Sequence, residues 1–196
     1  MTDSNHRHSE YNVDPIFLDR WSPRAFDGTA MPKDDLMTIL DAGHWAPSAF
    51  NYQPWRFVYG LKGTPAFEKL LGLLIEFNQG WARNASALVF VASDTLSRPA
   101  DGSEAKSYRS HSFDAGAAWG LLSLQAVKLG YFAHAMTGVD FDRAMTELNV
   151  PDGFHINAAV AIGKRGDLSV LPEGLRGREA PNDRKPLAEV ALEGGF

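Results

Sequence analysis

A short run of apolar residues constrains the fold of this 196-residue chain more than any other feature. Residues 87–92 read Ala-Leu-Val-Phe-Val-Ala, with no polar residue among them. A strand with one solvated face alternates apolar and polar residues, so a continuous run of this length indicates a strand covered on both faces. Helical and strand patterns interleave along the chain, which favours the α+β or α/β class, with a mixed, mainly antiparallel sheet flanked by helices.

Three segments have apolar residues at helical spacing and predict the main helices: residues 32–43, 65–80 and 111–129. The third is rich in small residues: Ala115, Gly116, Ala117, Ala118 and Gly120. Small side chains let another backbone approach closely. We therefore expect a long central helix that is packed on all sides, with a second subunit as one candidate neighbour.

Four further segments predict strands: residues 56–61, 131–136, 156–163 and 187–192. Asp140 is placed to cap a short helix between the second and third of them. Residues 94–107 are rich in Ser, Pro, Gly, Asp and Lys, so they form either a solvated loop or a lid. We expect residues 1–11 to be a flexible arm and residues 12–196 to form a single domain.

The composition excludes several kinds of chemistry. The chain has no cysteine, so it has no disulfide, no cysteine nucleophile and no thiolate metal site, and redox chemistry requires a bound group. A net charge of -5 gives no general attraction to nucleic acid or to anionic membranes. The chain has neither an apolar run of about 20 residues nor a signal-peptide core, so we expect a cytoplasmic protein with no metal site.

Residues 46–55 read Ala-Pro-Ser-Ala-Phe-Asn-Tyr-Gln-Pro-Trp and join a predicted helix to a predicted strand. The two prolines fix backbone φ angles, while Ser48, Asn51 and Gln53 supply hydrogen-bonding side chains. Read alone, the segment is either a turn whose polar side chains cap their own backbone or a rigid loop that grips a ligand.

Arg20 and Arg24 lie four residues apart with Ser22 between them. Guanidinium groups bind phosphate through two parallel hydrogen bonds, so the pair either converges on an anion or lies in solvent. The glycine signatures of Rossmann and P-loop sites are missing, as are the G-x-S-x-G and H-E-x-x-H motifs. The scattered histidines favour structural or surface roles, although His111 and His134 are candidates to line a pocket.

Three motifs in this order resemble the nitroreductase family of FMN-dependent oxidoreductases, and the resemblance extends from Asp14 to Leu192. They are Arg-Trp-Ser-Pro-Arg-Ala-Phe at residues 20–26, the whole of residues 46–55, and Ala-Ile-Gly at residues 161–163. The resemblance implies a homodimeric α+β fold with the long central helix at the dimer interface. It also implies two FMN sites at that interface and a C-terminal tail, residues 164–196, that wraps the partner.

The resemblance also implies a set of cofactor-binding residues. Arg20, Ser22 and Arg184 would bind the phosphate, and Arg24 would face the N1/O2 side of the flavin, where a cation stabilises the reduced form. Pro47, Ser48 and Asn51 would reach the flavin of the partner, with Gln53 bracing their loop and Trp21 and Ala49 completing the two motifs. Asn78 would bond the pyrimidine edge, and Thr137 and Gly138 would present backbone near N5.

The implied activity is ping-pong hydride transfer from NAD(P)H through FMN to a small electron-poor acceptor, such as a nitroaromatic or a quinone, with no catalytic side chain. The alternatives are other flavin chemistry (dehalogenation, alkene oxidation or flavin fragmentation) and a flavin-binding module without turnover. Asn182 stands where many relatives have a second basic residue. Whether Lys185 contacts the phosphate therefore stays open.

Overall fold

The computed structural model describes residues 5–99 and 102–196, so parts of the predicted arm (residues 1–4) and lid (residues 100–101) lie outside it. Its helices are α1 (Pro15–Asp19), α2 (Lys33–His44), α3 (Pro65–Gly72), α4 (Glu76–Ala82), α5 (His111–Lys128), α6 (Phe141–Glu147) and α7 (Glu173–Arg176). Its strands are β1 (Trp55–Leu61), β2 (Ala87–Asp94), β3 (Leu96–Ser97), β4 (Lys106–Ser107), β5 (Phe132–Met136) and β6 (Phe154–Gly163). Short 3₁₀ turns occupy Ala49–Asn51, Leu168–Val170 and Leu187–Glu189.

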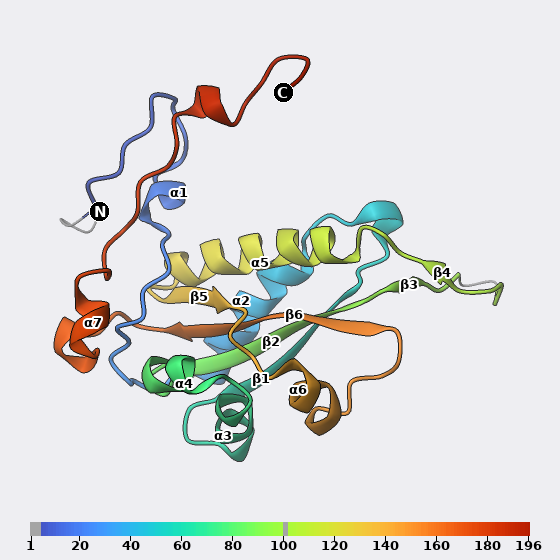
Figure 1. Ribbon diagram of the computed structural model, residues 1–196, viewed down its shortest axis with the longest axis horizontal. Coiled ribbons are helices and arrows are strands. Elements are labelled where there is room, and N and C mark those ends of the chain that lie inside the picture. Colours follow the sequence, from blue (N-terminus) through green and yellow to red (C-terminus); the bar gives the residue numbers. More distant parts are fainter. Residues whose placement is uncertain (1–4, 100–101) are drawn as a thin grey trace.

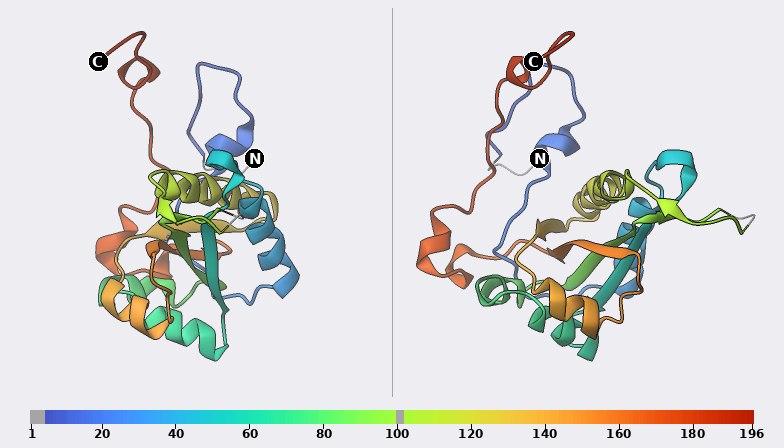
Figure 2. Two further views of the ribbon diagram at one scale, coloured as in Figure 1. Left: turned by 90° about the vertical axis from the view of Figure 1, so that its right-hand side faces the viewer. Right: turned by 45° about the vertical axis from the view of Figure 1, so that its right-hand side comes forward.

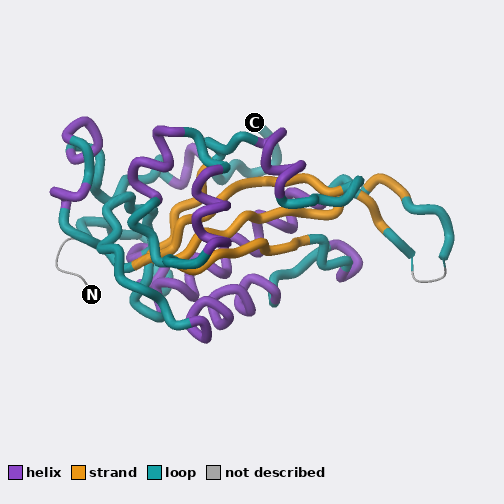
Figure 3. The backbone as a smooth tube through the Cα atoms, turned by 90° about the horizontal axis from the view of Figure 1, so that it is seen from below, coloured by secondary structure: helices purple, strands orange, loops and turns teal. Residues whose placement is uncertain are grey.

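The central sheet has the strand order β1-β2-β6-β5, and each neighbouring pair is antiparallel. All eight residues of β2 are buried, which confirms the strand covered on both faces. Helices lie on both sides of the strands in Figures 1 and 3. The prediction of an α+β fold with a mainly antiparallel sheet is therefore confirmed.

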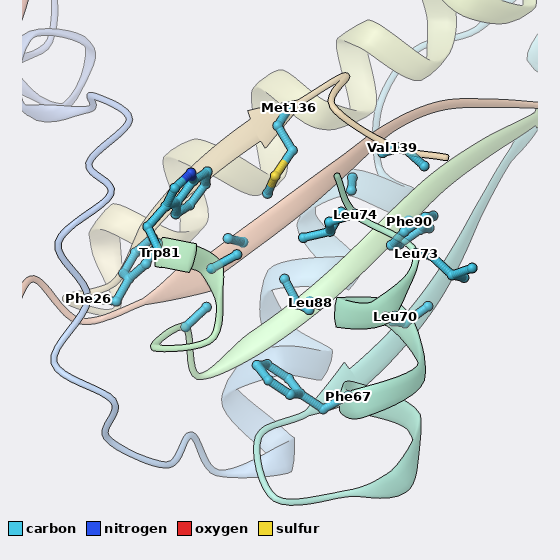
Figure 4. Close-up of a cluster of buried hydrophobic side chains, with 14 of the residues drawn as sticks. Phe26, Phe67, Leu70, Leu73, Leu74, Trp81, Leu88, Phe90, Met136 and Val139 are labelled. Atoms are coloured by element: carbon cyan, nitrogen blue, oxygen red, sulfur yellow. The ribbon is translucent and has the colours of Figure 1, made fainter. Parts of the chain in front are cut away.

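Successive residues of β2 point into two different cores. On one face, Val89 and Val91 pack with Leu36 and Ile39 of α2 and with Leu122 of α5. The other core is shown in Figure 4 and is lined by larger side chains from α3, α4 and the sheet, including Phe67, Leu70, Trp81, Leu88 and Phe90. This two-sided burial is the main apolar contribution to the stability of the fold.

Within one chain, helix α5 packs on the sheet and α2 along one side. The expectation that a second subunit covers another side stays a prediction. Ala115, Ala118 and Leu122 are buried against the sheet and α2. On the opposite side Phe113 is 82% exposed, and a Cβ added at Gly116 would meet no atom within 4 Å. The chain therefore leaves a face of small and apolar residues on α5 uncovered.

The predicted helix over residues 65–80 is wrong in one respect, because the segment forms two helices, α3 and α4. Residues 73–75 leave the helical path between them. Leu74 forms an isolated antiparallel bridge with Val139, and the N–H of Ile75 donates to the carbonyl of Gly138 at 3.1 Å. Backbone bonds to a distant segment thus replace the bonds that a continuous helix would make.

The strand predicted at residues 187–192 is also wrong. Pro186 precedes a 3₁₀ turn, Leu187–Glu189, in which the N–H of Glu189 donates to the carbonyl of Pro186 at 3.0 Å. A proline has the φ angle of a helical first turn and has no N–H for a sheet ladder. The local chain therefore closes into a turn.

The N-terminal arm and the C-terminal tail leave the body of the protein on the same side and lie near each other (Figure 2). Arg7 links them, because its Nε donates to the carbonyl of Asn182 at 2.7 Å and its Nη1 to the carbonyl of Arg20 at 2.8 Å. Within the described residues, no helix is both long and apolar enough to cross a membrane.

Candidate functional site

The segment that carries Arg20, Ser22 and Arg24 is extended and is held at both of its ends. It leaves α1 at Arg20 and ends where Phe26 forms an antiparallel bridge with Arg165, just beyond β6. Trp21 is 5% exposed and packs edge-on against Phe132 of β5, with 6.2 Å between the ring centroids. Its indole therefore anchors the segment to the sheet.

Three arginines gather at the start of this segment. Arg20 is partly buried, and its Nη1 donates to Oγ of Ser22 at 3.3 Å. Burial lowers the pKa of Arg20, and the charges of Arg7 and Arg184 lower it further. These cations repel one another, and Arg20 is partly removed from water, so an anion bound among them would relieve the repulsion.

Arg184 comes to this cluster from the C-terminal tail. Its Nη1 donates to the backbone carbonyls of Asn182 and Asp183, at 3.3 and 3.1 Å. The structure thus brings Arg184 near Arg20, from which it is separated by most of the sequence. Arg184 and the neighbouring Lys185 are both exposed.

Asn78 and Gly138 form a second polar group. Asn78 is 7% exposed; its Nδ2 donates to the carbonyl of Gly138 at 3.1 Å, and its Oδ1 accepts from Nε1 of Trp81 at 3.2 Å. A Cβ at Gly138 would lie 2.2 Å from Nδ2 of Asn78 and 2.8 Å from Cδ1 of Ile75. Only glycine fits here, and the preceding Thr137 is exposed.

His134, a candidate pocket residue from the sequence, contacts both groups. Its Nδ1 lies 3.0 Å from the carbonyl of Pro23, and its ring centroid lies 4.8 Å from that of Trp81. Burial is the main reason that the pKa of His134 falls to about 4, and the Arg24 and Arg20 charges add to the effect. The imidazole is therefore neutral, and its Nδ1–H donates to the carbonyl of Pro23 in the arginine segment.

The loop at residues 46–55 has an unusual backbone that its own side chains bond. Phe50, Asn51 and Gln53 have φ angles of 52°, 56° and 50°, in a region that non-glycine residues rarely adopt. Ser48 accepts the N–H of Gln53 on its Oγ at 3.0 Å, and Gln53 donates from Nε2 to the carbonyl of Asn51 at 3.1 Å. Pro47 and Asn51 are exposed.

Asp114, in the first turn of α5, fixes this loop. Its buried carboxylate accepts the N–H of Ala49 at 3.3 Å and also the hydroxyl of Tyr108. The same hydroxyl reaches the carbonyl of Ala49 at 3.2 Å. Burial and the Asp114 carboxylate raise the pKa of Tyr108, so its hydroxyl stays protonated and continues to donate.

The predicted site residues fall into two separate halves in one chain. Ala49 is bonded to the first turn of α5, whereas Trp21 packs on Phe132, four residues beyond the end of that helix. An 18-residue helix is about 27 Å long. Figure 1 shows the same separation, with the 46–55 loop and the arginine segment at opposite ends of α5. No small cofactor therefore meets both halves within one copy of the chain.

The fold is that of an α+β protein, and its polar residues gather in two groups near opposite ends of α5. The nitroreductase family profile matches residues 18–62 and 62–164. The chain therefore belongs to the nitroreductase family.

Three similar proteins illustrate the relationship. A solved structure described as an oxidoreductase containing FMN is 57% identical, with a TM-score of 0.95 over 100% of this chain and 98% of the other. An uncharacterized 15.4 kDa protein of Mycolicibacterium smegmatis is 35% identical over 71% of this chain and 95% of its own length. The CLA biosynthesis enone reductase of Lactiplantibacillus plantarum is 28% identical over 76% and 83%, respectively.

Sequence reasoning missed three residues that shape the site: Arg7, Trp81 and Glu179. Trp81 sits in a helix pattern that signals only a core residue, and Arg7 lies in a polar arm. Glu179 lies in a charged tail, where nothing local indicates that it is buried. His134 was one of the histidines that could line a pocket, and the structure places it beneath the arginine segment.

The shifted pKa of His134 predicts a pH dependence of stability. The unfolded chain binds this proton below about 6.5, whereas the folded chain binds it only below about 4. Between these values the unfolded state carries more protons, so stability falls as the pH falls, by up to about 3 kcal/mol. Urea denaturation from pH 7 to pH 4 should show this loss in the wild type and less of it in His134→Gln.

Substitution of the exposed His8 by Gln is the matched control, because it removes one histidine that is not among the contacts of His134. If His134→Gln loses stability with the same pH profile as the wild type and the control, the proposed neutral state of His134 is wrong.

Proposed function

We propose that this protein is an FMN-dependent oxidoreductase that acts as a homodimer and takes its electrons from NAD(P)H. The observation that carries the proposal is the crowding of three arginines, Arg7, Arg20 and Arg184, where burial and mutual repulsion lower the pKa of Arg20 and of Arg7. A phosphate dianion is the kind of ligand that such a group stabilises.

The remaining residues fit the rest of FMN. Asn78 uses one amide N–H and one oxygen lone pair within the protein, which leaves one donor and one acceptor for a pyrimidine edge. Gly138 lets the side chain of Asn78 pack directly against it, because Asn78 and Ile75 fill the space that a Cβ would need. The backbone of Gly138 and of the exposed Thr137 would face the flavin ring. Arg24 has a side chain that is 23% exposed, and it would face the N1/O2 edge.

When bound, FMN would supply the hydride chemistry that links a nicotinamide to an acceptor. The protein binds and orients the ring. Arg24 places a positive charge where negative charge develops during reduction, and this stabilises the reduced form. No side chain of the site is required as a general acid or base.

The proposal of a dimer rests on the separation of the arginine segment from the 46–55 loop within one chain. The arginine segment of one chain and the 46–55 loop of another would complete one site, so a dimer would hold two. The uncovered face of α5, with Phe113 82% exposed, supports this arrangement, as does Phe50, which is 90% exposed at the tip of the loop. The tail at residues 164–196 would wrap around the partner subunit.

The acceptor is a small electron-poor molecule, such as a nitroaromatic or a quinone. A second candidate is the carbon–carbon double bond of an enone, because a 28% identical relative over 183 residues is an enone reductase. In that case the hydride would add to the β-carbon and a proton from solvent would complete the reduction. Both reactions use the same reduced flavin.

Turnover tests the proposal directly. Under anaerobic conditions NADH or NADPH should bleach the flavin absorbance of the purified protein, and addition of a quinone, a nitroaromatic or an enone should restore it. Steady-state rates of about 1 s⁻¹ or more with one acceptor indicate an enzyme. If neither nicotinamide reduces the flavin, the proposal is wrong. The protein would then be a flavin-binding module or an enzyme with a different flavin chemistry.

Loss of the phosphate contact should weaken binding of FMN. Arg20→Ala removes a charge-assisted hydrogen-bonding group, so we expect the dissociation constant for FMN to rise roughly 10- to 100-fold. Fluorescence titration of the apoprotein measures it. Lys33→Ala is the matched control, because it removes an exposed cation at the start of α2 and should leave the affinity unchanged. Equal affinities in the two variants would contradict this phosphate site.

A mixing experiment tests whether two subunits build each site. Arg20→Ala damages one half, and Asn51→Asp damages the other while keeping a residue that tolerates a positive φ angle. In random mixed dimers about a quarter of the sites combine two intact halves, so FMN content should recover above that of either variant alone. If each chain held FMN by itself, the mixture would show only the average of the two variants.

A further inference from the structure

Glu179 is a buried carboxylate next to the arginine segment. It lies in the tail three residues after α7, and its side chain is only 1% exposed. Burial of a charged group is costly unless hydrogen bonds and an opposite charge compensate for it. Its partners therefore indicate why the chain holds a carboxylate here.

One oxygen of Glu179 is fully used, and the other is not. Oε1 accepts two backbone N–H groups, from Arg24 at 2.5 Å and from Ala25 at 2.7 Å. Oε2 is buried and has no hydrogen-bond partner among the described residues. It lies 3.9 Å from Nη1 of Arg24, too far for a hydrogen bond but close enough for a strong charge interaction.

Glu179 acts on Arg24 in two ways, through the backbone and through charge. The two N–H bonds fix the backbone of Arg24, which directs its side chain. The free oxygen places a negative charge beside the guanidinium without drawing it into a paired, two-point ion pair. The Arg24 side chain is 23% exposed, so the carboxylate restrains the arginine but leaves it free to contact a ligand.

We propose that Glu179 is a positioning residue that aims Arg24 at the flavin and, by offsetting part of its charge, lowers the reduction potential of the bound FMN. This inference rests on the proposed function. A hydride brings two electrons and one proton to the flavin, so reduction leaves one negative charge near N1 and O2. Arg24 favours that charge and the Glu179 carboxylate opposes it, which makes the reduced flavin a stronger hydride donor.

A purely structural role for Glu179 makes a different prediction. If the carboxylate only tied the tail to the arginine segment, an isosteric amide would preserve the tie and leave the potential unchanged. The side chain of glutamine keeps one carbonyl oxygen for the two N–H groups and replaces the second, charged oxygen by a neutral NH2 group. Glu179→Gln therefore separates the electrostatic effect from the anchoring.

The experiment compares full-length FMN-bound wild type, Glu179→Gln and Glu173→Gln. Glu173 is an exposed residue of α7, so its substitution makes the same change in net charge away from Arg24. The reduction potential is measured by anaerobic titration with a reference dye, and the affinity for oxidised FMN by fluorescence. We expect Glu179→Gln to raise the affinity for reduced relative to oxidised FMN about tenfold, which corresponds to ~30 mV for a two-electron couple.

The reduction potentials of the two variants decide between these roles of Glu179. A rise in potential with Glu179→Gln but not with Glu173→Gln supports the inference. An unchanged or lower potential overturns it, and so does a variant that no longer folds by circular dichroism, because the carboxylate would then be structural. A wild-type protein that binds no FMN would instead contradict the proposed function, so the two failures can be told apart.

Discussion

Burial of β2 on both faces is the constraint on which the rest of the structure depends. A strand with no solvated face requires a layer of apolar side chains on either side, and the chain provides α2 and α5 on one and α3 and α4 on the other. The strand order places β2 and β6 in the middle of the sheet. Two of the polar segments are attached to these elements: Phe26 forms a bridge just beyond β6, and Ala49 is bonded to the first turn of α5.

The polar groups of the site gather where their charges are not balanced within one chain. Arg7, Arg20 and Arg184 repel one another, and α5 presents an apolar face to solvent. Both features cost free energy in the isolated chain, and a bound phosphate and a second subunit would relieve them. The two features that destabilise the single chain are therefore the ones that the proposed cofactor and the proposed partner would stabilise.

Much of the fold follows from local patterns, and the errors have local causes. The apolar run of β2, the small-residue helix α5 and the Asp140 cap of α6 all appear as predicted, because period, length and capping residues express them directly. The break between α3 and α4 was missed, since the bond from Ile75 to Gly138 that causes it joins residues far apart in the chain. The turn after Pro186 was misread as a strand because its apolar residues also suit one.

By itself, the sequence determined the two-sided sheet, the absence of cysteine chemistry and the polar motifs around Arg20 and Ser48. Only the tertiary structure decided that these motifs lie at opposite ends of α5, that the partly buried His134 is neutral and bonded to Pro23, and that Glu179 is buried against Arg24. The physical reason is the sequence distance over which each kind of interaction acts. Periodicity and turn chemistry act over a few residues, whereas burial, pKa and charge pairing depend on neighbours that only the folded chain brings together.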